Sequence, residues 1–180
     1  IVFGDWSSDV CSSDLVVRGG KLYIGAKNQY ALIPTKDIQY TLKVKNIRQL
    51  EVSGLGYVYC SQLNADTIKI ISSGSSQLKF DSLVSQNLFV EIDGAGIFKI
   101  NGVTEKQNIF VSGAGAYDAG NLRSQNAEIE ISGAGSATLW VESSLEVKLS
   151  GATSLRYYGK PIIKKNVSGI SRIEELGIHP

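Results

Sequence analysis

The sequence has little of the chemistry on which most catalytic and metal sites depend. Its 180 residues include one histidine, His179, next to the C-terminus, two cysteines and no methionine. A structural zinc site needs about four Cys, His or carboxylate ligands, and a Ser–His–Asp triad needs a well-placed histidine. The composition therefore predicts no catalytic residue, no metal site and no bound cofactor.

Net charge and long apolar runs are also lacking. The formal net charge is +1, which gives no electrostatic field to attract nucleic acid. No apolar run reaches the ~18 residues of a membrane-spanning segment, so no span is predicted in this sequence. With 43% hydrophobic residues, however, the chain has enough apolar material to form a core.

The first fifteen residues, IVFGDWSSDVCSSDL, have no apolar periodicity and contain SSD twice. Residues 5–15 can be back-translated into a primer tail used in short-read DNA sequencing libraries. We therefore expect residues 1–15 to be non-native, and exclude them from fold reasoning as a cloning scar would be excluded. It follows that Cys60 is the only native cysteine. The natural N-terminus, with any signal region, is then expected to be missing from this sequence.

A repeat with a period near twenty residues organises the rest of the chain. Each unit carries a short segment that ends in glycine, as in LEVSGLG, VEIDGAG, IFVSGAG and IEISGAG. Successive glycines are 20, 20, 19, 20, 18 and 18 residues apart. We call these seven residues the anchor glycines: Gly54, Gly74, Gly94, Gly113, Gly133, Gly151 and Gly169.

Apolar and polar residues alternate on both sides of every anchor. The unit around Gly133 is typical, with Ile129 and Ile131 before the anchor and Ala137 and Leu139 after it. The residues between these positions are mostly polar, and period-two alternation predicts strands with one buried face. Cys60 occupies one of the inward positions, so it is predicted to fill the core.

Units that repeat in the same phase predict coils stacked in parallel. A sandwich of hairpins would need tight turns such as Asn-Gly, and only Asn101-Gly102 has that sequence. We therefore predict an all-β, single-stranded, right-handed parallel β-helix (β-solenoid) of about seven coils of 18–20 residues. The right hand follows from the general rule for parallel crossovers.

Each anchor glycine is predicted to form a structural turn, because glycine alone enters left-handed backbone regions without a Cβ penalty. Gly-x-Gly pairs such as Gly94/Gly96 do not predict a phosphate site, since a strand and not a helix follows them. Residues 16–180 are thus expected to form one solenoid domain. Residues 16–47 make an irregular first coil or cap, 48–170 the repeats, and 171–180 a C-terminal cap. Strands are expected at 15–17, 21–25 and 40–46, with a loop over 26–37.

The repeated (V/I/L)-S-G-(A/L)-G units, the Tyr158-Gly159-Lys160-Pro161 step and the lead-in LKVKNIRQLEVSG over 42–54 resemble one known family. They are similar to the bacterial auto-transporter adhesin head domain, or GIN domain, over residues 22–176. The resemblance implies a right-handed β-helix, export beyond the inner membrane, and a role at the cell surface or envelope. The Gly-Ile-Asn signature that names the family is absent from this sequence.

Parallel β-helices also carry polysaccharide lyases and glycosidases, which need two carboxylates facing the sugar. Glu91 and Glu130 are predicted to lie two coils apart with Phe110 between them, and Asp118 has no acidic neighbour in its column. We interpret these acids as parts of a solvated face. Aromatic residues are better candidates for binding, by stacking on sugars or packing on a partner, although they would also suit corners as fillers. They are Tyr57, Tyr59, Trp140 and Tyr158.

The sequence therefore favours a non-catalytic, exported cell-envelope or surface module that binds a glycan or protein not yet identified. One alternative is a carbohydrate-active enzyme on the same scaffold, which predicts paired acids on neighbouring coils. Another is an envelope scaffold or sensor, which predicts one coherent apolar outer face.

Overall fold

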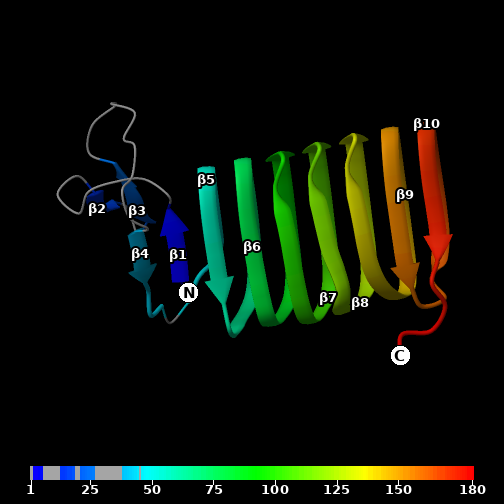
Figure 1. The fold of residues 1–180 in the computed structure, drawn as a ribbon. Coiled ribbons are helices and arrows are strands. Elements are labelled where there is room, and N and C mark those ends of the chain that lie inside the picture. The colour runs from blue at the N-terminus through cyan, green and yellow to red at the C-terminus, as the bar shows by residue number, and fades with distance from the viewer. Residues whose placement is uncertain (1, 6–12, 19–20, 27–37, 45) are drawn as a thin grey trace.

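A computed structural model describes residues 2–5, 13–18, 21–26, 38–44 and 46–180 of the chain. Within these ranges the chain is all-β and contains no helix. Figure 1 shows the later strands following one another as successive turns of one spring. The strands are β1 (Val2–Asp5), β2 (Ser13–Arg18), β3 (Lys21–Ala26), β4 (Ile38–Thr41), β5 (Gln49–Cys60), β6 (Leu63–Gly94), β7 (Ile97–Gly113), β8 (Ala116–Gly133), β9 (Ser136–Tyr158) and β10 (Ile162–Glu175).

From β5 to β10 every strand pairs in parallel with the next strand along the chain. Equivalent residues of successive units are register partners, as in the series Gly113, Gly133, Gly151 and Gly169. The chain thus forms a β-solenoid of about seven turns, which confirms the predicted architecture. The right-handed sense of the coil stays a prediction.

Columns of equivalent apolar side chains fill the interior. The residues predicted to point inwards around Gly133, namely Ile129, Ile131, Ala137 and Leu139, are all buried. Full burial of a large aliphatic side chain contributes roughly 1.5–3 kcal/mol to stability, and each column buries one inward side chain in every inner coil. Cys60 also lies in this core, and burial raises the pKa of its thiol. The alternation read from the sequence therefore has the correct phase.

The inner corners pack closely around their glycines. All seven anchor glycines have positive φ, and that of Gly113 is 105°. A Cβ on Gly113 would lie 2.7 Å from the carbonyl oxygen of Gly94 in the coil before it. The second glycine of the pair meets side chains instead: a Cβ on Gly135 would lie 2.9 Å from Cγ2 of Ile131. Tight stacking of backbone on backbone therefore favours the first glycine in every coil after the first, and dense packing inside the corner favours the second glycine in the coils that have one.

The second coil fills the same corner with different residues. Ser72 stands where the other coils have an aliphatic side chain, and Ser76 stands where the first, third, fourth and fifth coils have the second glycine. Both are buried, and their hydroxyl groups are joined by a hydrogen bond. The smaller inward residue makes space for the added side chain, and each hydroxyl satisfies the other in an apolar surrounding.

A polar network crosses the middle of the core. The buried Tyr117 hydroxyl donates to Oε1 of Gln107 over 3.1 Å, and Nε2 of Gln107 donates to the Ser124 hydroxyl over 2.8 Å. Ser124 in turn donates to the carbonyl oxygen of Trp140. Burial raises the pKa of Tyr117, so its proton stays in place as a donor. Tyr117 follows Gly113 by four residues, as the inward Ala137 follows Gly133, so the alternation predicts its inward place; it does not predict the partner Gln107.

The N-terminal strands pair differently from the coils. β1 is antiparallel to both β4 and β5, and β2 and β3 form a separate antiparallel pair. The strands expected over 15–17 and 21–25 correspond to β2 and β3. The strand expected over 40–46 is wrong in extent, because β4 ends at Thr41, the last residue that pairs with β1. The loop expected over 26–37 begins on Ala26, which is in β3, and its other residues lie outside those described.

The repeats continue further than the sequence predicts. β10 pairs with β9 up to Glu175, which is opposite Tyr157, so the strand extends beyond the expected end at residue 170. The chain then turns back against the solenoid: Leu176 N–H donates to the carbonyl of Tyr157, and Gly159 N–H donates to the carbonyl of Gly177. The start expected for the C-terminal cap, residue 171, is therefore too early, because the charged residues that follow Gly169 belong to a regular coil.

Candidate functional site

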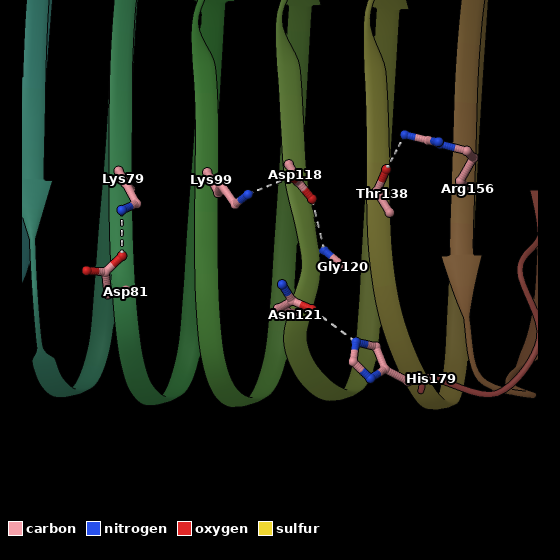
Figure 2. Close-up of polar contacts among 9 residues, drawn as sticks. All are labelled: Lys79, Asp81, Lys99, Asp118, Gly120, Asn121, Thr138, Arg156 and His179. Atoms are coloured by element: carbon pink, nitrogen blue, oxygen red, sulfur yellow. Dashed lines mark hydrogen bonds and ion pairs between the residues drawn. The ribbon is translucent and has the colours of Figure 1, made fainter.

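Two outer faces of the solenoid carry most of its charged groups. The post-anchor face follows each corner, and Figure 2 shows part of it with side chains. Its central column alternates with the buried columns, as predicted. Successive members are register partners, except that Thr138 and Arg156, both in β9, are joined by a hydrogen bond. The members are Tyr59, Lys79, Lys99, Asp118, Thr138, Arg156 and Glu174.

Charges on the post-anchor face are paired with one another. Lys79 Nζ lies 3.0 Å from Asp81 Oδ1, and the Tyr59 hydroxyl donates to Asp81 Oδ2 over 2.6 Å. These two donors lower the pKa of Asp81, and its carboxylate raises the pKa of both partners. Further along, Lys99 lies 3.8 Å from Asp118, and Arg156 donates to the Thr138 hydroxyl. The central column, all of it in the described part of the chain, therefore places no two carboxylates opposite each other.

The four predicted aromatic residues fall into two separate pairs. Tyr57 and Tyr59 project from β5 in the first coil, with Tyr57 exposed and Tyr59 half-buried. Lys79 Nζ lies 5.3 Å from the centre of the Tyr59 ring, a cation–π distance. Trp140 and Tyr158 belong to β9, the fifth and sixth coils. The structure does not bring the two pairs together.

The pair on β9 contacts the end of the chain. The imidazole ring of His179 stacks on Trp140, and the edge of Tyr158 meets the same imidazole at a centroid distance of 5.0 Å. His179 Nε2 also lies 3.1 Å from Oδ1 of Asn121 in β8, as Figure 2 shows. Residues 140 and 158 thus hold the C-terminal segment against the solenoid. Both side chains are half-buried there.

The pre-anchor face holds a carboxylate pair that the sequence reasoning missed. On this side, which precedes each corner, Glu128 and Glu146 are register partners in adjacent coils. Their separation of 18 residues equals that of the anchors Gly133 and Gly151, so the same spacing rule could have found them. On this face only the column that contains Glu91 and Glu130 was considered, and there the predicted order of Glu91, Phe110 and Glu130 is present.

Lysines neutralise the new pair. Lys148 Nζ lies 2.9 Å from Glu128 and 3.7 Å from Glu146, and Lys164 Nζ lies 3.3 Å from Glu146. The hydrogen bond from Lys148 lowers the pKa of Glu128 and raises that of Lys148. Both carboxylates border a groove of about 510 Å³, which Lys106 and Lys164 also line. The groove is therefore bordered by acidic and basic side chains that pair with one another.

Large apolar residues are exposed on more than one side of the coil. Phe89 and Phe110 lie on the pre-anchor face, and Ile97 follows a corner. Val84 and Val103 are register partners on the segment that joins the post-anchor side of one coil to the pre-anchor side of the next. No single side collects them, in the part of the chain that the structure describes. This distribution does not match the coherent apolar face that a scaffold or sensor predicts.

No metal centre or membrane helix is found in the described ranges. They contain no group of three or more His, Cys, Asp or Glu residues placed to hold a metal ion. They also contain no helix of the length and apolarity that crossing a bilayer requires.

Comparison with known proteins places the chain in a family. The model of the family described as "Putative auto-transporter adhesin, head GIN domain" matches residues 12–161. The chain belongs to this family. The resemblance based on the S-G-A-G units is thereby confirmed, as is the identification of a GIN domain.

Two solved structures share the fold of this GIN-domain chain. One is described as a "putative adhesin" from Bacteroides fragilis, with a TM-score of 0.82 and 24% identity over 93% of this chain and 78% of the other. The second is described as a "Putative lipid binding protein" from Parabacteroides distasonis, with a TM-score of 0.69 and 19% identity over 92% of this chain and 79% of the other. Among curated proteins none matches. At these identities the structures show the fold alone.

Proposed function

We propose that this GIN-domain chain is a non-catalytic module exported to the cell surface or envelope, where it binds a glycan or a protein. Membership of an adhesin family supports the surface role. The B. fragilis structure, itself described as a "putative adhesin", supports the same assignment. The solenoid suits it, because its long outer faces present many side chains on a rigid frame.

The state of the Glu128–Glu146 pair carries the non-catalytic part of the proposal. A glycosidase needs one carboxyl group that keeps its proton, and therefore a raised pKa. The hydrogen bond from Lys148 has the opposite effect, because it lowers the pKa of Glu128. The same ammonium group also lies 3.7 Å from Glu146. The geometry supports an ion-paired outer face better than an acid–base pair.

We place the binding surface on the two tyrosine rings of the first coil. Tyr57 is 37% exposed and projects from the same face of β5 as Tyr59. The phenol of Tyr59 is fixed by Asp81, and a fixed ring loses little entropy when a sugar or a side chain stacks on it. Trp140 and Tyr158 could take a ligand only after the contact with His179 opens.

A glycan array, with a parallel screen of host and bacterial surface proteins, tests the binding. We expect retention of a ligand by the full chain and its loss in Tyr57→Ala. Tyr23→Ala is the matched control, because Tyr23 is also exposed but lies on β3, outside the coils. Equal binding by both variants would place the surface elsewhere.

The enzyme alternative has its own outcome in the same assay. Bound oligosaccharides are recovered and analysed for cleavage products. We expect none, and we expect Glu128→Gln with Glu146→Gln to leave the oligosaccharides intact as well. Products that form with the unmodified chain and disappear in this double variant would establish catalysis by the carboxylate pair.

A further inference from the structure

The outer edge of β10 ends the sheet. β10 pairs with β9 on one side, and no other strand in the described part of the chain pairs with its second side. The backbone groups of this edge can accept another strand. Residues 176–180 do not cover it, since they return along the coils as far as Asn121.

In every coil the inward positions are arranged symmetrically about the corner, and this symmetry determines how the edge of β10 can pair. The middle residue of each corner follows the anchor, and inward side chains lie three and five positions away on both sides of it. In the fifth coil the middle residue is Ala134, with Ile131 and Ala137 at three positions and Ile129 and Leu139 at five. A two-fold axis through the middle residue would therefore superpose one inward set on the other.

The last coil carries opposite charges at two of these related positions. Its middle residue is Ile170, with Val167 and Ile173 at three positions, and Lys165 and Glu175 at five. Lys165 and Glu175 are opposite Val147 and Tyr157, so they continue columns that are apolar in the other coils. A charge in an apolar column at an edge normally discourages pairing. Here the two charges are complementary under the two-fold operation.

We propose that the partner of this edge is a second copy of the chain, joined end to end about a two-fold axis through Ile170. The two β10 strands pair antiparallel. Lys165 then faces the partner's Glu175, Val167 faces the partner's Ile173, and Ile170, which is 86% exposed in the single chain, faces its own copy. The interface is isologous, so the Lys165–Glu175 and Val167–Ile173 contacts each occur twice, and the Ile170 contact lies on the axis.

Neighbouring registers are less favourable. A shift that centres the pairing on Gly169 would place Lys165 opposite Ile173 and Glu175 opposite Ile163. A shift that centres it on Ser171 would place Val167 opposite Glu175. Each alternative puts a charge against an aliphatic side chain at the end of the core, which costs free energy unless the charge finds a partner. The self-complementary charges therefore select one register.

Sedimentation equilibrium of the full chain tests the association. We expect a monomer–dimer equilibrium, and we expect Lys165→Glu to raise the dissociation constant at least about tenfold, because the introduced carboxylate of one copy would face Glu175 of the other. Glu175→Lys should act in the same way. The double variant, Lys165→Glu with Glu175→Lys, restores opposite charges and should restore the dimer. A monomer at every concentration, or a dimer unaffected by the single variants, would overturn the proposal.

A single cysteine tests the register independently. Directly opposed residues of antiparallel strands have Cα atoms about 4.5–5.5 Å apart, within the range of a disulfide. Ile170→Cys, in a chain with Cys11→Ser, should therefore form an intermolecular disulfide on mild oxidation. Ile162→Cys is the matched control, because Ile162 is 84% exposed on β10 but far from the axis. Cross-linking through position 162 and not 170 would contradict the proposed interface.

Discussion

The imidazole ring of His179 lies on the indole ring of Trp140, with the ring centres 4.0 Å apart and the planes inclined by 8°. This contact joins the end of the chain to the fifth coil. Stacked rings of this kind contribute about 0.5–1.5 kcal/mol beyond area burial. We expect His179→Ala to lower the free energy of unfolding by about that amount and to expose one face of Trp140.

Quenching of tryptophan fluorescence by acrylamide measures this exposure, in a chain with Trp6→Phe so that Trp140 alone emits. The quenching constant should rise in His179→Ala. Ile178→Ala serves as the control, since Ile178 is exposed and adjoins the histidine without being aromatic. Equal quenching in the two variants would mean that the tail does not cover Trp140 in solution.

Replacing an anchor glycine should cost most where another coil precedes it, because the added Cβ meets the carbonyl oxygen of the preceding anchor. Gly113→Ala forces a Cβ to 2.7 Å from the carbonyl oxygen of Gly94 and also strains a backbone with φ of 105°. We expect a loss of at least about 3 kcal/mol. At Gly54 no atom lies within 4 Å of the added Cβ, so Gly54→Ala should cost only the backbone strain, about 1–2 kcal/mol. Urea unfolding of both variants measures the difference, and equal losses would exclude the stacking clash as the cause.

Two substitutions by aspartate test which residues of a strand point inwards and which point outwards. Ile131 is fully buried and Thr138 is half-buried on the post-anchor face. Ile131→Asp places a charge without a partner in the core and should cost at least about 3–5 kcal/mol, enough to unfold the solenoid. Thr138→Asp should leave the circular-dichroism spectrum unchanged and lower the denaturation midpoint only slightly, since Arg156 lies beside it and offsets the repulsion from Asp118, its register partner. If Thr138→Asp were the less stable of the two variants, the assignment of inward and outward residues would be displaced by one position.

The Glu128–Lys148 contact predicts a dependence on acid. Because the pKa of Glu128 is lowered in the folded chain, the folded state holds this proton less tightly than the unfolded state does. The stabilisation is complete above the unfolded pKa of about 4.3 and is lost as pH falls through the folded pKa. Between about pH 5 and pH 3 the wild type should therefore lose more stability than Glu128→Gln. Parallel slopes in urea unfolding at these pH values would contradict the prediction.

A chain that begins at residue 16 tests the expectation that residues 1–15 are non-native. β1 pairs with only three residues of β5, from Tyr57 to Tyr59, so its loss removes few contacts from the coils. We expect the shorter chain to keep the same spectrum and thermal midpoint within a few degrees. A chain that fails to fold would show that the first residues are part of the domain.

Much of the fold could be predicted because each coil repeats one pattern. The inward positions of Ile131 and Leu139, and the alignment of Gly113 with Gly133, follow from a period of two within a period near twenty. Departures from the pattern were less visible. Ser72 can be assigned to its inward column by spacing alone, but its partner Ser76 lies across a corner whose shape the sequence does not show.

The site was harder to predict for a physical reason. Spacing shows which residues share a column, and applied to every column it would have placed Glu128 beside Glu146. It does not show how a long lysine side chain such as that of Lys148 reaches two carboxylates. The contact of His179 with Asn121 joins residues 58 positions apart in a segment without the repeat. No periodic signal could have indicated it.

Stacking of equivalent residues from successive coils is the foundation of the fold, the site and the end-to-end interface. A pair of cysteines tests it most directly, because Asp118 and Thr138 are register partners in β8 and β9. Asp118→Cys with Thr138→Cys should form an intramolecular disulfide on oxidation, detected by peptide mapping, since paired strands lie about 4.8 Å apart. Asp118→Cys with Ser136→Cys, displaced by two residues along the strand, should not. A disulfide in the second pair and none in the first would contradict the stacked-coil arrangement.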